Sequence, residues 1–164
     1  MKVLAGMYCI GNFYTRMEIV KNTKARFLYQ VLEEIEAGIV LTGTEVKSLR
    51  LKKVALVDAY GVIKQDELFL LNLRIEPYSH STHFTHDPVR TRKLLLHSKE
   101  IKRIKGKLSE KGWAIIPLKM YFKNNKNVKV LLGLCKGKKA HDKRDSIKNK
   151  DLNREALREL KSFK

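Results

Sequence analysis

Short apolar runs alternate with Gly, Asn, Asp and Pro between about residue 21 and residue 135. Runs of this length, bounded by turn residues, are typical of β-strands. Two pairs of runs flank a turn: 59–64 with 67–73 around Gln65-Asp66, and 113–122 with 128–134 around the Asn-rich 123–127. Because Asn and Asp tolerate left-handed backbone angles, both pairs predict β-hairpins. Pro117 lacks an N–H donor, so we expect it at a sheet edge or a bulge.

Two short helices are predicted beside these strands. Ser98 is expected to N-cap a helix that begins at Lys99, with its apolar residues on one face: Ile101, Ile104 and Leu108. Thr44 is expected to cap a short helical turn over 45–50, which buries Val46 and Leu49.

The run from 27 to 41 fits two structures. Helical spacing joins Phe27, Val31 and Ile35, whereas a period of two joins Val31, Ile35, Ala37, Ile39 and Leu41. Periodicity alone leaves both open. Five or six short strands with two or three short helices predict a mainly β chain, a small antiparallel β-barrel of the OB type. We divide the chain into an N-terminal extension without function (1–20), the barrel (21–135) and a flexible basic C-terminal tail (136–164).

Charge indicates the class of partner. The 164 residues include 35 Lys and Arg against 17 Asp and Glu, a formal net charge of +18. Such self-repulsion is typical of chains that bind polyanions, because each phosphate contact releases counterions. No apolar run reaches about 18 residues, and no long amphipathic helix is visible, so we expect no membrane partner. Cys9 and Cys135 form no CxxC motif, which favours a reducing, cytoplasmic compartment.

Motifs for catalysis and cofactor binding are nearly absent. The segment 133–139 resembles a phosphate loop, but its two glycines, Gly133 and Gly137, are one residue too close together. No Ser or Thr follows the lysine after the second glycine. His80, His83 and His86 recur every third residue, but no cysteine is near to complete a tetrahedral metal site. We therefore predict no enzyme activity, no metal and no cofactor. Two alternatives stay open: a generic OB-type module for single strands, and an RNA-modifying enzyme that uses the histidine loop.

A basic cluster at 90–93 precedes three leucines. In an extended segment alternate side chains point the same way, so Arg90 and Arg92 are predicted to bind neighbouring phosphates together. A solvated edge strand protected by its charges is the alternative interpretation.

Several strings in chain order carry a family resemblance: Asn22-Thr23-Lys24-Ala25-Arg26, Glu36-Ala37-Gly38-Ile39, Gly43-Thr44-Glu45-Val46-Lys47-Ser48-Leu49-Arg50, Asp58-Ala59-Tyr60, Asp87-Pro88-Val89-Arg90-Thr91-Arg92-Lys93-Leu94-Leu95-Leu96, Ile116-Pro117-Leu118-Lys119, and Lys136 to Arg144. Together they resemble the SmpB family from about Val20 to Lys164. One departure is Lys52, which stands where the family usually has a glycine-containing turn, so a non-glycine residue must adopt that turn's geometry.

The resemblance implies an OB-type barrel that binds the tRNA-like domain of transfer-messenger RNA and delivers it to stalled ribosomes without catalysis. It implies further partners: the ribosome, through small-subunit RNA at the decoding centre, and elongation factor Tu in the delivery complex. The resemblance also implies a monomer, and it favours the strand over the helix for 27–41.

By matching motif, the resemblance implies RNA binding by Asn22, Glu36 and Leu95. Asn22 would hydrogen-bond base edges or a 2′-hydroxyl, and Leu95 would pack on an exposed base or ribose. Glu36 would accept from an exocyclic amine or hold a neighbouring Arg or Lys in place. Composition adds expected phosphate contacts from seven basic residues: Lys24, Arg26, Lys47, Arg90, Arg92, Lys138 and Lys139.

The tail carries its own implied role. His141 resembles the residue that stacks on a base at the decoding centre, and Asp142-Lys143-Arg144 matches the element needed for ribosomal accommodation. One apolar stripe follows at helical spacing: Leu152, Ala156, Leu160 and Phe163. A helix of this length is marginal in isolation, so we expect it to form only in the message channel.

Overall fold

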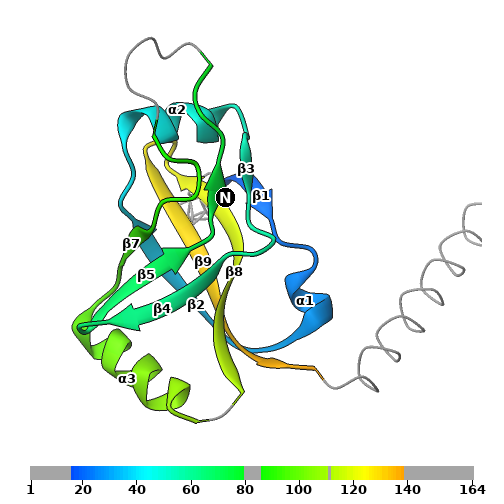
Figure 1. The fold of residues 1–164 in the computed structure, drawn as a ribbon, viewed down its shortest axis with the longest axis vertical. Coiled ribbons are helices and arrows are strands. Elements are labelled where there is room, and N and C mark those ends of the chain that lie inside the picture. Colours follow the sequence, from blue (N-terminus) through cyan, green and yellow to red (C-terminus); the bar gives the residue numbers. More distant parts are fainter. Residues whose placement is uncertain (1–15, 80–85, 111, 139–164) are drawn as a thin grey trace, which may run out of the picture.

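The computed structural model describes residues 16–79, 86–110 and 112–138. Within them the elements follow in this order: β1 (Arg16–Lys21), α1 (Ala25–Leu28), β2 (Tyr29–Ile39), α2 (Gly43–Arg50), β3 (Val54–Ala55), β4 (Tyr60–Lys64), β5 (Glu67–Leu71), β6 (Arg74–Ile75), β7 (Arg92–Leu95), α3 (Ser98–Leu108), β8 (Trp113–Lys123) and β9 (Asn127–Gly137). Figure 1 shows α2 and α3 at opposite ends of the strands.

Seven strands form one antiparallel sheet in the order β1-β8-β4-β5-β7-β2-β9, and β9 pairs again with β8. This second pairing closes the sheet into a barrel, which leaves few strand edges unpaired. Strand β8 pairs with β4 near its start, at Ile115, and with β1 toward its end. The prediction of a mainly β, antiparallel barrel with two or three short helices is confirmed.

Both predicted hairpins are present, and their turn residues explain them. Gln65 and Asp66, between β4 and β5, have φ of 48° and 56°, and Asn124 and Asn125, between β8 and β9, both have φ of 55°. Two successive left-handed residues match the right-handed twist of paired strands. Pro117 lies where the β8–β9 register shifts, so the predicted bulge is confirmed.

The core fills the barrel interior from alternate positions of its strands. Leu68 and Leu70 of β5 and Val130 and Leu132 of β9 are almost completely buried. Strand β2 runs over most of the ambiguous segment, because β9 and β7 supply backbone partners on its two sides. The strand interpretation of 27–41 is therefore confirmed from residue 29 to residue 39, while Phe27 lies in the short helix α1.

Both longer helices are present, but their predicted N-caps are wrong. The N-cap of α3 is His97 instead of Ser98, and that of α2 is Thr42 instead of Thr44. In each helix a glutamate three residues after the cap accepts a hydrogen bond from the cap's backbone N–H: Glu45 from Thr42 at 2.7 Å, and Glu100 from His97 at 3.0 Å. In both helices the side chain of the cap residue also faces the backbone N–H of that glutamate, which completes a capping box. The capping box favours a helix that starts at the earlier residue.

The predicted boundary at residue 20 is also wrong. Strand β1 begins at Arg16 and pairs with β8, and Ile19 is 7% exposed within the core. The reason is that β8 is longer than β4 and offers a second partner edge beyond it. At the other end, β9 continues to Gly137. The first 15 residues and the tail from 139 lie outside the described residues.

The turn after α2 has Lys52 in the left-handed region, with φ of 57°. Its N–H bonds the carbonyl oxygen of Leu49 at 3.0 Å, and that of Lys53 bonds Ser48 at 3.1 Å. This is the Schellman cap that glycine normally completes.

We therefore expect Lys52→Gly to stabilise the protein by about 0.5–1 kcal/mol, because relief of the left-handed strain exceeds the entropy that glycine adds to the unfolded chain. Urea unfolding measures the change. Lys53→Gly is the matched control, since Lys53 has no positive φ, and it should be destabilising. Equal loss of stability in both variants would contradict the strain at Lys52.

Candidate nucleic-acid interface

One row of the barrel's outer surface is set by the strand register. Gly38 on β2 lies opposite Leu95 on β7 and Lys129 on β9, and Lys129 lies opposite Tyr121 on β8. Directly opposed residues in an antiparallel sheet share a face, so Leu95, Lys129 and Tyr121 lie on the same face as Gly38.

The neighbouring row joins Glu36 on β2, Leu131 on β9 and Lys119 on β8. Four residues of these two rows, together with Lys123 of β8, form a surface that we call the Leu95 face: Glu36, Leu95, Lys119, Lys123 and Lys129.

Glu36 holds a lysine in place on this face. Its carboxylate accepts hydrogen bonds from the Tyr121 hydroxyl and from Lys123 Nζ, the latter at 3.0 Å. Tyr121 is only 2% exposed, and Lys119 Nζ lies 5.8 Å from the centre of its ring. Of the two roles expected for Glu36, this arrangement fits the second, in which the carboxylate orients a neighbouring cation.

Leu95 projects beside a shallow groove. Its side chain is 53% exposed. The adjoining cavity of about 280 Å³ has apolar lining from Ile39, Leu41, Val46 and Val128, with Lys126 and Lys129 also lining it. A Cβ on Gly38 would lie 3.2 Å from Leu95 Cβ, so the glycine lets Leu95 pack closely on β2. An apolar surface beside cations suits an unstacked base or ribose and its flanking phosphates.

Arg92 has an internal structural role. It is completely buried, and its Nε donates to Glu45 at 2.8 Å. Nη1 donates to the carbonyl oxygens of Leu73 and Arg90, and Nη2 donates to that of Pro88. Each nitrogen of the guanidinium is bonded inside the protein, so a phosphate contact by Arg92 would compete with these bonds and stays a prediction.

Arg90 shares the same carboxylate. Its Nη2 lies 2.6 Å from Glu45 Oε2, and its side chain is 29% exposed. Burial alone would raise the pKa of Glu45, but hydrogen bonds from Arg90, the Thr42 backbone and Arg92 outweigh it and hold that pKa at about 2. Through these bonds Glu45 links α2 to Arg90 and to Arg92 at the start of β7. RNA contact by Arg90 stays a prediction.

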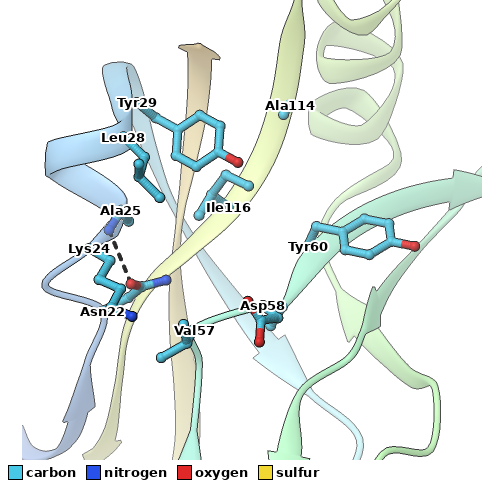
Figure 2. Close-up of a pocket in the computed structure, with 11 residues that line it drawn as sticks. Asn22, Lys24, Ala25, Leu28, Tyr29, Val57, Asp58, Tyr60, Ala114 and Ile116 are labelled. Atoms are coloured by element: carbon cyan, nitrogen blue, oxygen red, sulfur yellow. Dashed lines mark hydrogen bonds between the residues drawn. The ribbon is translucent and has the colours of Figure 1, made fainter. Parts of the chain in front are cut away.

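Asn22 is 5% exposed and also bonded internally. Its Nδ2 donates to the carbonyl oxygens of Leu56 at 3.1 Å and Pro117 at 3.2 Å, and its Oδ1 accepts from the Ala25 N–H at 3.1 Å. Both amide hydrogens are thus in use inside the protein, and the expected donation from Asn22 to RNA stays a prediction. Figure 2 shows its bond to Ala25 at the edge of a cavity of about 380 Å³ between α1, β4 and β8.

The other predicted phosphate contacts are spread over several elements. Lys24 lines the cavity beside α1. Arg26 pairs with Glu34 at 2.6 Å, and Lys47 Nζ lies 5.4 Å from the centre of the Tyr78 ring. Lys138 donates its backbone N–H to Leu28 at 3.1 Å. These four residues are outside the Leu95 face, and their RNA contacts stay predictions. The remaining predicted site residues lie outside the described residues: Lys139, His141, Asp142, Lys143 and Arg144.

Sequence reasoning missed three lysines of the Leu95 face. Lys119 and Lys123 are partly exposed and lie on the same face of β8 as the buried Tyr121, whereas Met120 and Phe122 lie on the core face. A period of two along 119–123 and 128–132 is visible in the sequence, and it predicts which side chains point outward.

The histidine loop is only partly described. His86 Nδ1 lies 3.0 Å from Thr44 Oγ1, and Nε2 lies 3.2 Å from the Ile75 carbonyl oxygen. His80 and His83 are outside the described residues. Among those that are described, no group of three His, Cys, Asp or Glu is arranged to hold a metal, and no helix is long and apolar enough to cross a membrane.

Comparison with known proteins identifies the family of the chain. The family model described as SmpB protein matches residues 19–162. An SsrA-binding protein of Treponema denticola is 53% identical over 87% of this chain and 92% of its own. That of Aquifex aeolicus is 54% identical over 87% and 91%. A chain of the solved structure "tmRNA-SmpB: a journey to the center of the bacterial ribosome" is 49% identical, with a TM-score of 0.63 over 74% of this chain and 85% of its own. The chain belongs to the SmpB family.

Proposed function

We propose that this chain binds the tRNA-like domain of transfer-messenger RNA through the Leu95 face and delivers it to stalled ribosomes in trans-translation. The observation that carries the proposal is the face itself, where an exposed leucine lies beside an apolar groove and three lysines. The related proteins support the choice of RNA, since they are named SsrA-binding proteins.

The geometry suits recognition by shape. Lysines at fixed register positions bind phosphates and set the orientation of the RNA, but they carry no sequence information. Leu95 adds an apolar contact to an unstacked base or ribose, which regular duplex RNA does not offer. Because Glu36 orients Lys123 in advance, less side-chain entropy is lost when the RNA binds.

The proposal includes the partners of the complete pathway. The chain acts as a monomeric adaptor without catalysis, metal or cofactor. Its tail occupies the empty message channel, where His141 and Asp142-Lys143-Arg144 contact small-subunit RNA at the decoding centre. Elongation factor Tu joins the delivery complex, and these partners place the chain in the cytoplasm.

Binding to the tRNA-like domain, measured in a salt series with excess unrelated RNA, tests the proposal. Leu95→Ala and Glu36→Gln should each weaken binding by about tenfold, the loss expected for one apolar or oriented charged contact. Leu51→Ala is the matched control, because Leu51 is 52% exposed and outside the Leu95 face. Equal affinity for every RNA, with a steep salt dependence alone, would contradict the proposal and favour a generic basic barrel.

A further inference from the structure

Helix α3 has one buried side and one outer side. Ile101 and Ile104 are 8% and 2% exposed. At about 100° per residue, the side opposite these isoleucines carries four residues: Lys99, Lys102, Arg103 and Gly106. We call these four the α3 stripe.

Gly106 is a glycine that the fold does not require. A Cβ at this position would meet no atom within 4 Å, and the residue has no positive φ. Glycine is the least favourable residue in a helix apart from proline. One physical reason to retain glycine at an open helical position is the close approach of a ligand or another backbone.

The charges around the stripe leave its centre cationic. The lysines on its flank are neutralised: Lys105 pairs with Asp66 at 2.6 Å, and Lys107 pairs with Glu33 at 2.8 Å. Arg103 also contacts Glu33. Among the described residues, Lys99 and Lys102 form no ion pair, although the charge of Lys102 also acts on Asp66, more weakly than that of Lys105. Lys99 and Lys102 therefore present charge to solvent on the same side as the uncovered backbone of Gly106.

The stripe begins close to the proposed RNA contact. Strand β7 ends at Leu95, and α3 begins at Ser98, so Lys99 lies four residues beyond Leu95. From Lys99 to Gly106 the helix rises by about 10 Å. A phosphate backbone that leaves Leu95 along α3 would pass the two lysines and then the glycine.

We propose that the α3 stripe is a second contact surface for the same tRNA-like RNA, with Gly106 at the closest approach of the phosphate backbone. The inference rests on the proposed function and extends it to a surface outside the Leu95 face. Unpaired lysines favour phosphates as the ligand, and the position directly after Leu95 favours the RNA already bound there over a separate partner.

The decisive variant of the full-length chain is Gly106→Ala, because its two effects should have opposite signs. Alanine is the better helix former, so the melting temperature should rise by about 2–4 °C. The added methyl group should hold the phosphate away and weaken binding of the tRNA-like domain by roughly fivefold, the effect of about one phosphate contact. Gly43→Ala is the matched control: Gly43 lies in α2 at the other end of the barrel, and its Cβ would also meet nothing within 4 Å. It should bind RNA as the unchanged chain does.

A second pair of variants tests the charges. Lys102→Gln should reduce the slope of log affinity against log salt by about one. Lys105→Gln removes the same charge from the same helix, but Lys105 is paired with Asp66, so the slope should change less.

Leu95→Ala, measured on the same RNA, separates the two proposals. If it weakens binding while Gly106→Ala and Lys102→Gln do not, the α3 stripe does not contact the tRNA-like RNA and the proposed function stands. If Gly106→Ala binds the RNA normally but loses binding to purified small subunits, the stripe contacts ribosomal RNA and the inference is overturned. If the unchanged chain shows no preference for the tRNA-like domain, the proposed function itself fails.

Discussion

Replacement of Glu45 by Gln is expected to destabilise the barrel by about 3–5 kcal/mol, the usual loss when one partner of a buried ion pair is removed. Glu45 and Arg92 are both completely buried, and their closest contact is 2.8 Å. Without the carboxylate, the guanidinium of Arg92 stays in the core with its charge uncompensated. Arg90 loses the same partner, so α2 and the segment before β7 separate together.

Urea unfolding measures this loss, with Glu67→Gln as the matched control. Glu67 also pairs with a basic residue, but the carboxylate and Lys93 are 45% and 42% exposed. An exposed pair contributes at most about 1 kcal/mol, so the control should unfold almost as the unchanged chain does. A loss below about 1 kcal/mol in Glu45→Gln would contradict the proposed role of the buried pair.

The pH dependence of the unchanged chain gives a second measure of the same interaction. The pKa of Glu45 is about 2 in the folded state, below its usual value of 4.5. A carboxyl group with a lowered folded pKa contributes its stability above the unfolded value and loses it as the pH falls toward the folded value. The urea midpoint should therefore drop between pH 4.5 and pH 2, and this drop should be smaller in Glu45→Gln.

The features that the sequence predicted correctly are those set by local chemistry. Asn124, Asn125 and Asp66 occupy left-handed positions that their side chains tolerate, so both hairpins follow from their turns. Pro117 lacks a donor, and the bulge at that position follows from this alone. The segment 27–41 was different, because its strand structure depends on β9 and β7, which are distant in sequence.

The candidate site was predictable where position alone decides exposure. Leu95 follows the buried Leu94 and is exposed, as an outward strand position requires. Arg90 and Arg92 were predicted to share a ligand, and they do, but the ligand is Glu45, which lies 47 residues before Arg92. No local pattern indicates that a carboxylate from α2 will meet them. The same limit applies to Asn22, whose partners Leu56 and Pro117 are 34 and 95 residues away.

Asn22→Ala is expected to cost about 2–4 kcal/mol of folding free energy, the sum for three hydrogen bonds lost in a buried place. The Asn22 amide joins three parts of the chain: the loop before β4 through Leu56, strand β8 through Pro117, and the start of α1 through Ala25. Alanine leaves two carbonyl oxygens and one N–H without these partners, at a position where the side chain is only 5% exposed.

Urea unfolding and RNA binding, measured on the same samples, decide between this interpretation and direct RNA contact. Thr23→Ala is the matched control, because Thr23 is the exposed neighbour of Asn22 and its loss should change stability by less than about 0.5 kcal/mol. Asn22→Asp keeps the acceptor for Ala25 but removes both donors. At pH 7 it should be at least as unstable as Asn22→Ala, since a carboxylate then faces two carbonyl oxygens. If both Asn22 variants fold with normal stability but lose the tRNA-like RNA, Asn22 binds that RNA directly and the buried amide has another partner in the complex.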